Sequence, residues 1–191
     1  MIKAGVLGAG HLGKIHLRLL AASERYELVG FFDPDKKNAA ALASEKGYKY
    51  FNSPEALIDA CDMIDIVTPT VFHHQVAQQA LQAGKHIFIE KPIANSLSEA
   101  QEITEMAKKH QVLGQVGHVE RFNPAFKAVA DSITHPKFIE SHRLAEFNPR
   151  GTDVPVVLDL MIHDLDILLS IVNAKIKSVS ASGVAVISST P

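Results

Sequence analysis

Three polar residues, Asp159, His163 and Asp166, stand at successive spacings of four and three in a largely apolar segment. In an α-helix this spacing places all three side chains on one side. Histidine exchanges protons near neutral pH, and carboxylates one turn away can orient its ring. We therefore regard His163 as a candidate proton-transfer residue. A solvated polar face or a metal site would use the same residue types, but no third His/Cys cluster or zinc-type spacing accompanies them, so we expect no metal.

Lys91 is a second residue that could take part in chemistry. It directly follows the apolar run 86–90 and precedes Pro92. At the carboxyl end of a parallel strand, a lysine fixed by a following proline points into the crevice where such sheets bind ligands. A solvated lysine at a strand end is the simpler alternative, and the polar residues of the helix supply the context that favours chemistry.

A Gly-x-Gly-x-x-Gly pattern, made by Gly8, Gly10 and Gly13, follows the apolar run 2–7 and opens a predicted helix. The first glycine permits a tight turn, the second lets a pyrophosphate approach the backbone, and the third allows close packing of helix on strand. The helix N-terminus offers free N–H groups and a positive dipole end to phosphates. The context therefore predicts a dinucleotide-binding turn.

Asp33 ends the second apolar run, about twenty residues after Gly13, where an acidic side chain meets the adenosine ribose. A carboxylate there accepts hydrogen bonds from both ribose hydroxyls and repels a 2′-phosphate, so we predict NAD as the cofactor and regard NADP as the weaker candidate. A turn or helix-cap role before Pro34 is the alternative. Lys36 and Lys37 leave dual specificity open.

The elements that would position these residues alternate between short apolar runs and amphipathic segments, which is typical of a parallel sheet with helical crossovers. We predict strands at 2–7, 27–33, 48–51, 63–68, 86–90 and 112–116. We predict helices at 11–22, 34–46, 53–60, 71–83 and 98–110, the last beginning with a capping box made by Ser98 and Gln101. The fold class is therefore α/β, a Rossmann-type doubly wound parallel sheet over residues 1–118.

The regular alternation of apolar runs and amphipathic segments ends before residues 119–191. The pattern of this part predicts the start of an α+β, open-sheet domain. We expect a helix at 123–132, a strand at 137–147, a loop at 148–155, a helix at 156–172 and a strand at 176–188 with a bulge at Gly183. The apolar residues of the long helix predict a buried face, formed by Leu158, Met161, Ile162, Leu165, Leu168, Leu169 and Val172. Two or three strands leave open edges and bury little area, so we expect the chain to stop part-way through this domain.

Composition narrows the classes of protein. The 191 residues are 47% hydrophobic, which suffices for a core, and carry a formal net charge of −2 without a dense basic run. We therefore expect no nucleic-acid partner and no anionic membrane surface. No apolar stretch is long enough to cross a bilayer, and the single cysteine, Cys61, excludes an internal disulfide framework. We expect a cytoplasmic protein.

Four segments in order resemble the glucose–fructose oxidoreductase/inositol dehydrogenase/rhizopine catabolism (Gfo/Idh/MocA) family. They are the glycine pattern extended to His16, Thr68-Pro69 with His73, the run 84–92 ending in Glu90-Lys91-Pro92, and Asp159-x-x-x-His163-x-x-Asp166. The resemblance implies an N-terminal Rossmann domain, and a C-terminal open-sheet domain that also serves oligomerisation. It therefore implies a homo-oligomer, a dimer or tetramer, for the full-length protein.

The resemblance also implies roles for individual residues. Lys91, Asp159 and His163 would be the catalytic trio: His163 takes the proton from a substrate hydroxyl, Lys91 stabilises the alkoxide, and Asp159 positions the substrate or tunes the other two. The residues assigned to the cofactor are Gly8, Gly10, His11, Leu12, Gly13, Asp33, Thr68, Pro69, His73, Glu90 and Lys91. By itself, His73 would more often be a surface or capping histidine.

The substrate prediction rests on the segment 118–124, which looks like that of family members that oxidise nucleotide-linked sugars, particularly UDP-N-acetylglucosamine 3-dehydrogenases. The residues assigned to the substrate are Glu120, Arg121, Asn123, Asp159 and His163. Arg121 could meet a phosphate, with Arg143 and Arg150 as weaker candidates, whereas a strand-to-helix corner is the structural alternative for the segment. The predicted function is NAD-dependent oxidation of a UDP-N-acetylhexosamine at C3. An inositol or free-aldose dehydrogenase and a non-catalytic NAD-binding regulator are the alternatives.

Overall fold

The computed structural model describes residues 1–144 and 155–184. The chain divides into two compact units, Met1–Gly117 and His118–Pro191. The break falls one residue before the predicted boundary at 118/119. Arg150 and the predicted loop residues 148–154 lie outside the described residues.

The first unit is built around a five-stranded sheet in which each neighbouring pair is parallel. Its strands are β1 (Ile2–Leu7), β2 (Tyr26–Phe32), β3 (Met63–Ile66), β4 (His86–Ile89) and β5 (Gly114–Val116), in the order β2-β1-β3-β4-β5. The predicted strand at 48–51 is reduced to one parallel bridge between Tyr50 and Phe31 at the edge of β2. Counted as the third strand, this segment completes the order 3-2-1-4-5-6 of a Rossmann fold. The predicted fold class is thus confirmed.

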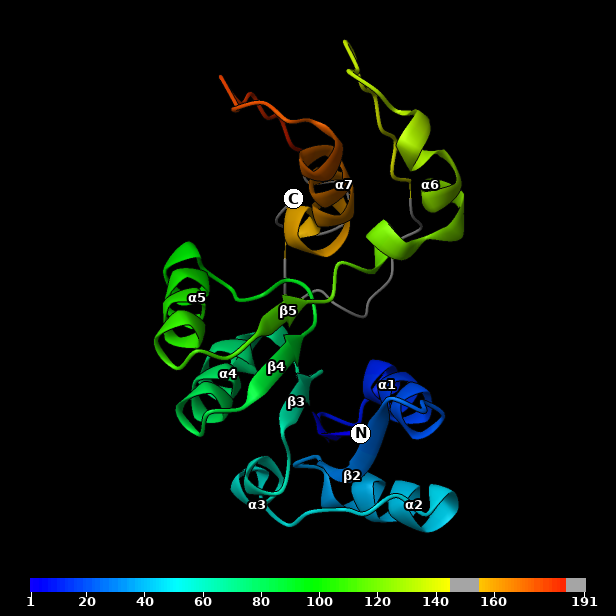
Figure 1. The fold of residues 1–191 in the computed structure, drawn as a ribbon, viewed down its shortest axis with the longest axis vertical. Coiled ribbons are helices and arrows are strands. Elements are labelled where there is room, and N and C mark those ends of the chain that lie inside the picture. Colours follow the sequence, from blue (N-terminus) through cyan, green and yellow to red (C-terminus); the bar gives the residue numbers. More distant parts are fainter. Residues whose placement is uncertain (145–154, 185–191) are drawn as a thin grey trace. The chain divides into compact units, whose positions relative to one another are not determined.

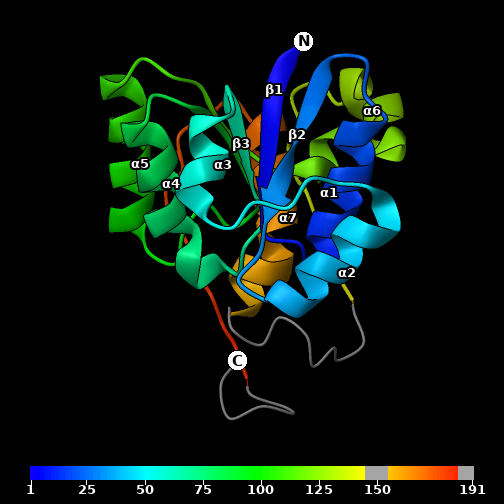
Figure 2. The same ribbon diagram turned by 90° about the horizontal axis from the view of Figure 1, so that it is seen from below.

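Helices cover both faces of this sheet. Figures 1 and 2 show α1 (His11–Ala21) and α2 (Lys36–Lys46) on one face, and α3 (Pro54–Asp59), α4 (His73–Gln82) and α5 (Leu97–Lys109) on the other. Each face has its own apolar core, because successive strand residues point to opposite sides. Val6 packs in the core under α1 and α2, whereas its neighbour Leu7 packs in the core under the other three helices.

The helix boundaries in the first unit are close to the predicted ones, but the residues that cap α5 were predicted wrongly. The capping box of α5 is made by Ser96 and Glu99, two residues earlier than the predicted Ser98 and Gln101. Ser96 accepts a hydrogen bond from the backbone N–H of Glu99, and the Glu99 carboxylate accepts one from the N–H of Ser96. Both Ser96-x-x-Glu99 and Ser98-x-x-Gln101 match the pattern of a capping box, so the pattern alone does not distinguish them.

The second unit contains short helices. They are η2 (Val119–Phe122), α6 (Pro124–Val129), η3 (Ala130–Ser132), the π-helical turn η4 (Val157–Met161) and α7 (Ile162–Ile171). The predicted helix at 156–172 is therefore present, but its first turns are π-helical.

The two strands predicted for this unit are wrong over the described residues, 137–144 and 176–184, which form no ladder. The predicted bulge at Gly183 fails with them, because a strand needs a partner to accept and donate its backbone hydrogen bonds. Residues 145–147 and 185–188 of these predictions lie outside the described part of the chain. The predicted buried face of the long helix is also wrong for Met161, Leu165 and Leu169, which are exposed because no described strand covers them.

Candidate functional site

The glycine turn after β1 has the geometry that its three glycines require. Gly8 adopts a φ of +99°, and a Cβ there would lie 2.6 Å from the carbonyl oxygen of Val67. A Cβ on Gly13 would collide with the carbonyl oxygen of Gly8. Gly10 differs, because a Cβ there would meet nothing within 4 Å. Gly8 and Gly13 thus serve the packing of the turn, and Gly10 borders open space that a ligand can occupy.

The start of α1 suits an anion. Gly10 precedes the helix, no side chain caps it, and its first turn, which begins with His11 and Leu12, holds no acidic residue. The first backbone N–H groups of a helix lack partners within the helix, and together with the macrodipole they favour phosphate. The residues present therefore fit the pyrophosphate of a dinucleotide.

Asp33 stands directly after β2 and is tied to the glycine turn. Its Oδ2 accepts a hydrogen bond of 2.7 Å from the N–H of Ala9, and its Oδ1 accepts one of 2.9 Å from the N–H of Asp35. Asp35, and not Asp33, caps α2 by accepting from the N–H of Asn38. Asp33 is therefore a turn residue held beside the glycine loop, where a ribose would be met, and it is not the helix cap.

Thr68 and Pro69 follow β3 at the same edge of the sheet. The Thr68 hydroxyl oxygen is buried and has no hydrogen-bond partner within residues 1–144 and 155–184. The backbone beside it, at Val67 and Thr68, is what a Cβ on Gly8 would strike. A buried polar atom normally finds a partner, so this hydroxyl beside the glycine turn fits a site that a ligand completes.

His73 begins α4 and is 1% exposed. Its Nδ1 lies 2.9 Å from the carbonyl oxygen of Pro92, and its Nε2 lies 2.9 Å from that of Thr68. Each ring nitrogen thus lies within hydrogen-bond distance of a backbone carbonyl oxygen. His73 therefore lies between two loops, and its assignment to the cofactor stays a prediction.

Glu90 and Lys91 follow β4, next to β3 in the sheet. Glu90 is 7% exposed, and its Oε2 accepts a hydrogen bond of 3.2 Å from the N–H of Lys91. The N–H of Glu90 donates to the carbonyl oxygen of Ile66, which anchors this turn to the end of β3. Lys91 therefore stands at the same carboxyl edge of the sheet as the glycine turn.

A buried ionic cluster lies under this edge. His16 of α1 approaches Asp65 of β3, with 2.9 Å between Nδ1 and Oδ2, and Glu90, with 3.4 Å between Nε2 and Oε1. Burial alone would lower the pKa of His16, but the two carboxylates outweigh it and raise the pKa to about 9. Burial raises the pKa of Asp65, against the opposing effect of His16. The imidazole is therefore charged at neutral pH.

In the second unit, Asp159 lies in the π-helical turn η4 and His163 in the first turn of α7. A π-helical turn holds more residues than an α-helical one. Asp159 and His163, although four residues apart, therefore do not have the regular α-helical alignment assumed for the predicted polar side. Such turns are frequent at functional sites. Within residues 1–144 and 155–184, no group of three or more His, Cys, Asp or Glu side chains could hold a metal ion.

The predicted substrate residues of the segment 118–124 have partners within the second unit. Arg121 forms two hydrogen bonds of 2.6 Å with Asp166. Asn123 caps α6 by accepting from the N–H of Ala125, and it donates from Nδ2 to Glu120 over 3.1 Å. Arg143, a weaker phosphate candidate, is paired with Asp164, whose pKa is lowered chiefly by that hydrogen bond. These contacts match the structural alternative that the sequence left open, a corner leading into a helix.

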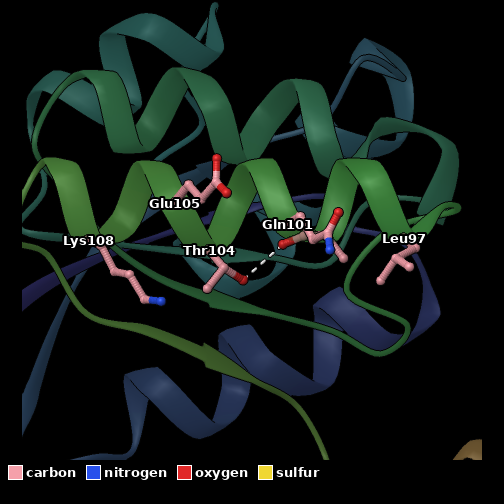
Figure 3. Close-up of a pocket in the computed structure, with 6 residues that line it drawn as sticks. Leu97, Gln101, Thr104, Glu105 and Lys108 are labelled. Carbon is pink, nitrogen blue, oxygen red and sulfur yellow. Dashed lines mark hydrogen bonds between the residues drawn. The ribbon is translucent and has the colours of Figure 1, made fainter.

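Two hollows lie in the surface of the first unit. One, of about 530 Å³, lies between α1 and α2 and is lined by His11, Lys14, Ile15, Arg18, Leu42, Glu45, Lys46 and Tyr48. The other, of about 310 Å³, lies along one face of α5 and is drawn in Figure 3. Its Thr104 hydroxyl already donates to the carbonyl oxygen of Ala100, and no predicted site residue lines it. We therefore place the candidate site at the carboxyl edge of the sheet.

A parallel sheet with helices on both faces and a glycine turn at its carboxyl edge defines a dinucleotide-binding α/β protein. The family model described as an oxidoreductase family with an NAD-binding Rossmann fold matches residues 2–118. The chain belongs to this family, the Gfo/Idh/MocA oxidoreductases, as the resemblance implied. The predicted cofactor, NAD, agrees with the family description.

Individual relatives extend the similarity beyond residue 118. The UDP-N-acetylglucosamine 3-dehydrogenase of Acidithiobacillus ferrooxidans is 40% identical over 187 residues, which make up 97% of this chain and 59% of the relative. Its solved structure matches with a TM-score of 0.91 at 39% identity, covering 98% of this chain and 62% of that chain. The scyllo-inositol 2-dehydrogenase (NAD(+)) of Bacillus subtilis is 33% identical over 195 residues, 95% of this chain and 57% of the relative. The chain thus spans about three fifths of the length of these relatives.

Asp65 was not among the residues predicted for the site, and His16 had no predicted role beyond the glycine motif. The signal was present, because Asp65 interrupts the apolar run Met63–Ile66 of a buried strand. A buried carboxylate must be paired, which should have prompted a search for a cation. No helix within the described residues is long and apolar enough to cross a membrane.

Proposed function

We propose that the protein carrying this chain is an NAD-dependent dehydrogenase that oxidises a sugar hydroxyl, and that its substrate is a UDP-linked N-acetylhexosamine oxidised at C3. The observation that carries the dehydrogenase proposal is the position of Lys91, which follows β4 at the same sheet edge as the dinucleotide turn. The 40% identity to a UDP-N-acetylglucosamine 3-dehydrogenase over 97% of the chain supports the choice of sugar.

In the proposed reaction, bound NAD supplies the hydride acceptor at C4 of its nicotinamide. His163 accepts the proton of the substrate hydroxyl, and the Lys91 ammonium donates a hydrogen bond to the same oxygen and stabilises its developing negative charge. Asp159 positions the substrate or tunes the other two residues. The glycine turn, the start of α1 and Asp33 hold and orient the dinucleotide.

The cofactor preference depends on Asp33. Its carboxylate is held beside the glycine turn by the N–H of Ala9, so a 2′-phosphate at the ribose would meet negative charge. This favours NAD over NADP. We also propose that the protein acts on a small-molecule substrate as a homo-oligomer in the cytoplasm, with residues 119–191 belonging to the substrate and oligomerisation domain.

The test is a panel of UDP-sugars, free sugars and inositols incubated with NAD, with NADH followed by its absorbance. We expect turnover with UDP-N-acetylhexosamines. Activity confined to inositol or free aldoses would reject the nucleotide-sugar substrate and favour the alternative function, an inositol or free-aldose dehydrogenase. NAD binding without turnover of any member of the panel would reject the enzyme and favour a regulator that binds NAD.

A pair of lysine variants separates chemistry from folding. Lys91→Met should lower kcat on the order of a hundred- to ten-thousandfold, which is the range for losing a group that acts on the reacting proton or charge. Lys85→Met is the matched control, because Lys85 precedes the same strand and donates to the carbonyl oxygen of Cys61 at the opposite end. Equal loss of activity in both variants would mean that Lys91 has no special role.

A further inference from the structure

Asp65 and Glu90 form a buried acidic pair with the His16 ring between them. Asp65 is 3% exposed within β3, and Glu90 is 7% exposed after β4. Ile64, Ile66, Ile87 and Ile89, which alternate with these two acids and with Phe88, pack in the core under α3, α4 and α5. The acids therefore project toward α1, where the His16 ring bonds one and approaches the other.

The Glu90 carboxylate is confined from further directions. It accepts the N–H of Lys91, and Gly117 lies against it after β5. A Cβ on Gly117 would be 2.7 Å from Oε1 of Glu90, so a larger residue there would force the carboxylate to shift. Phe88 also packs against the His16 ring, with 5.9 Å between the ring centroids. The position of Glu90, and with it the backbone of Lys91, is thus defined by α1 and the strand ends.

The opposite helical layer holds the other side of Lys91. His73 of α4 bonds the carbonyl oxygen of Pro92, and through its second ring nitrogen it lies against that of Thr68. Lys91 therefore lies between Glu90, which His16 approaches, and Pro92, whose carbonyl oxygen His73 contacts.

We propose that His16 and His73 are positioning residues, which hold the turn Glu90-Lys91-Pro92 from opposite faces of the sheet and so fix where Lys91 meets the substrate. The effect of this positioning on the substrate rests on the proposed function, whereas the holding of the turn does not. His16 faces two ionisable groups from the elements packed on it, Asp65 and Glu90, and as an imidazolium it can bond both at once. Neither histidine needs to touch substrate for this role.

The test compares His16→Gln and His73→Gln with His74→Gln in the protein that carries this chain. His74 is the matched control, because it also begins α4 and pairs with a carboxylate, Glu102, over 2.9 Å, but on the exposed surface. The first readout is hydrogen exchange at the Lys91 amide, whose N–H is bonded to Glu90. We expect exchange to accelerate about tenfold or more in the two test variants and to stay unchanged in the control.

The second readout is kinetic. A displaced lysine should lower kcat by about ten- to a hundredfold, whereas KM for the sugar and Kd for NAD should change by less than about threefold. Asp65→Asn should act in the same direction as His16→Gln and add little to it in the double variant, because both remove one bridge. A purely structural role would lower the melting temperature and leave the kcat of the folded fraction unchanged.

Two results would overturn the proposal: a Lys91 amide that exchanges as in the wild type in both test variants, or a kcat equal to that of His74→Gln. Where His16→Gln fails to fold, Gly117→Ala takes its place, since it displaces the Glu90 carboxylate without removing a charge. A wild-type protein without dehydrogenase activity would defeat the proposed function, and amide exchange would still decide whether the histidines hold the turn.

Discussion

Arg121 and Asp166, forty-five residues apart, are joined by two hydrogen bonds of 2.6 Å, one from Nε to Oδ2 and one from Nη2 to Oδ1. The hydrogen bond from Arg121 is the main cause of a lowered pKa of Asp166. His118 lies 3.8 Å from the same carboxylate. The planar fork of the guanidinium thus fastens the segment after the first unit to the helix that carries His163.

This pair yields a prediction about Arg121, which the sequence assigned to a substrate phosphate. Arg121→Met and Asp166→Asn should each lower the free energy of unfolding by about 1 to 3 kcal/mol, and the double variant should lose little more than either. Urea denaturation measures the three values. A large rise in KM for the UDP-sugar in Arg121→Met, with Asp166→Asn unaffected, would instead assign Arg121 to the phosphate.

The glycine turn predicts opposite effects for two similar substitutions. Gly10→Ala adds a methyl group to open space, so the free energy of unfolding should stay the same while NAD binds about tenfold or more weakly. Gly13→Ala drives the methyl group into the carbonyl oxygen of Gly8, so it should destabilise the first unit. Thermal unfolding and NAD titration by calorimetry check both. Equal melting temperatures for the two variants would contradict this division of roles.

The Rossmann unit could be predicted because its local signals agree with one another. Strands such as β1 and β4 are short apolar runs with a turn after each. Because both faces of a parallel sheet are buried, such strands can be recognised from the sequence without knowledge of the tertiary structure. The glycine turn and Asp33 follow from spacing alone. The edge segment at Tyr50 was harder, because it pairs only through a single bridge with Phe31.

The second unit and the ionic cluster could not be predicted in the same way. Strands were predicted at 137–147 and 176–188, but a sequence pattern cannot supply a partner for backbone hydrogen bonds, and the described residues 137–144 and 176–184 form no ladder. The pairing of His16 with Asp65 joins residues forty-nine apart, and no local spacing encodes it. The engagement of both His73 nitrogens likewise depends on how two loops meet in three dimensions.

The two serines near the start of α5 offer a test of the corrected capping box. Ser96→Ala should lower the free energy of unfolding by about 1 kcal/mol, since it removes the acceptor for the Glu99 N–H. Ser98→Ala, inside the first turn, should cost clearly less, because Ser98 bonds only the Ser96 hydroxyl among the described contacts. Chemical denaturation of both variants decides. A larger loss in Ser98→Ala would restore the boundary expected from the sequence.

The pH dependence of stability follows from His16. Its pKa is raised from 6.5 to about 9 in the folded chain by Asp65 and Glu90, against the effect of burial. Below pH 6.5 both the folded and the unfolded chain hold the proton, so the stabilisation by the ion pairs is complete. Between pH 6.5 and about 9 only the folded chain holds it, so each rise in pH favours unfolding, with a total loss of about 3 kcal/mol at most. The free energy of unfolding, measured in urea from pH 6 to 10, should therefore fall more steeply for the wild type than for His16→Gln. Parallel curves for His16→Gln and the wild type would show that the buried imidazole is not charged by its two carboxylates.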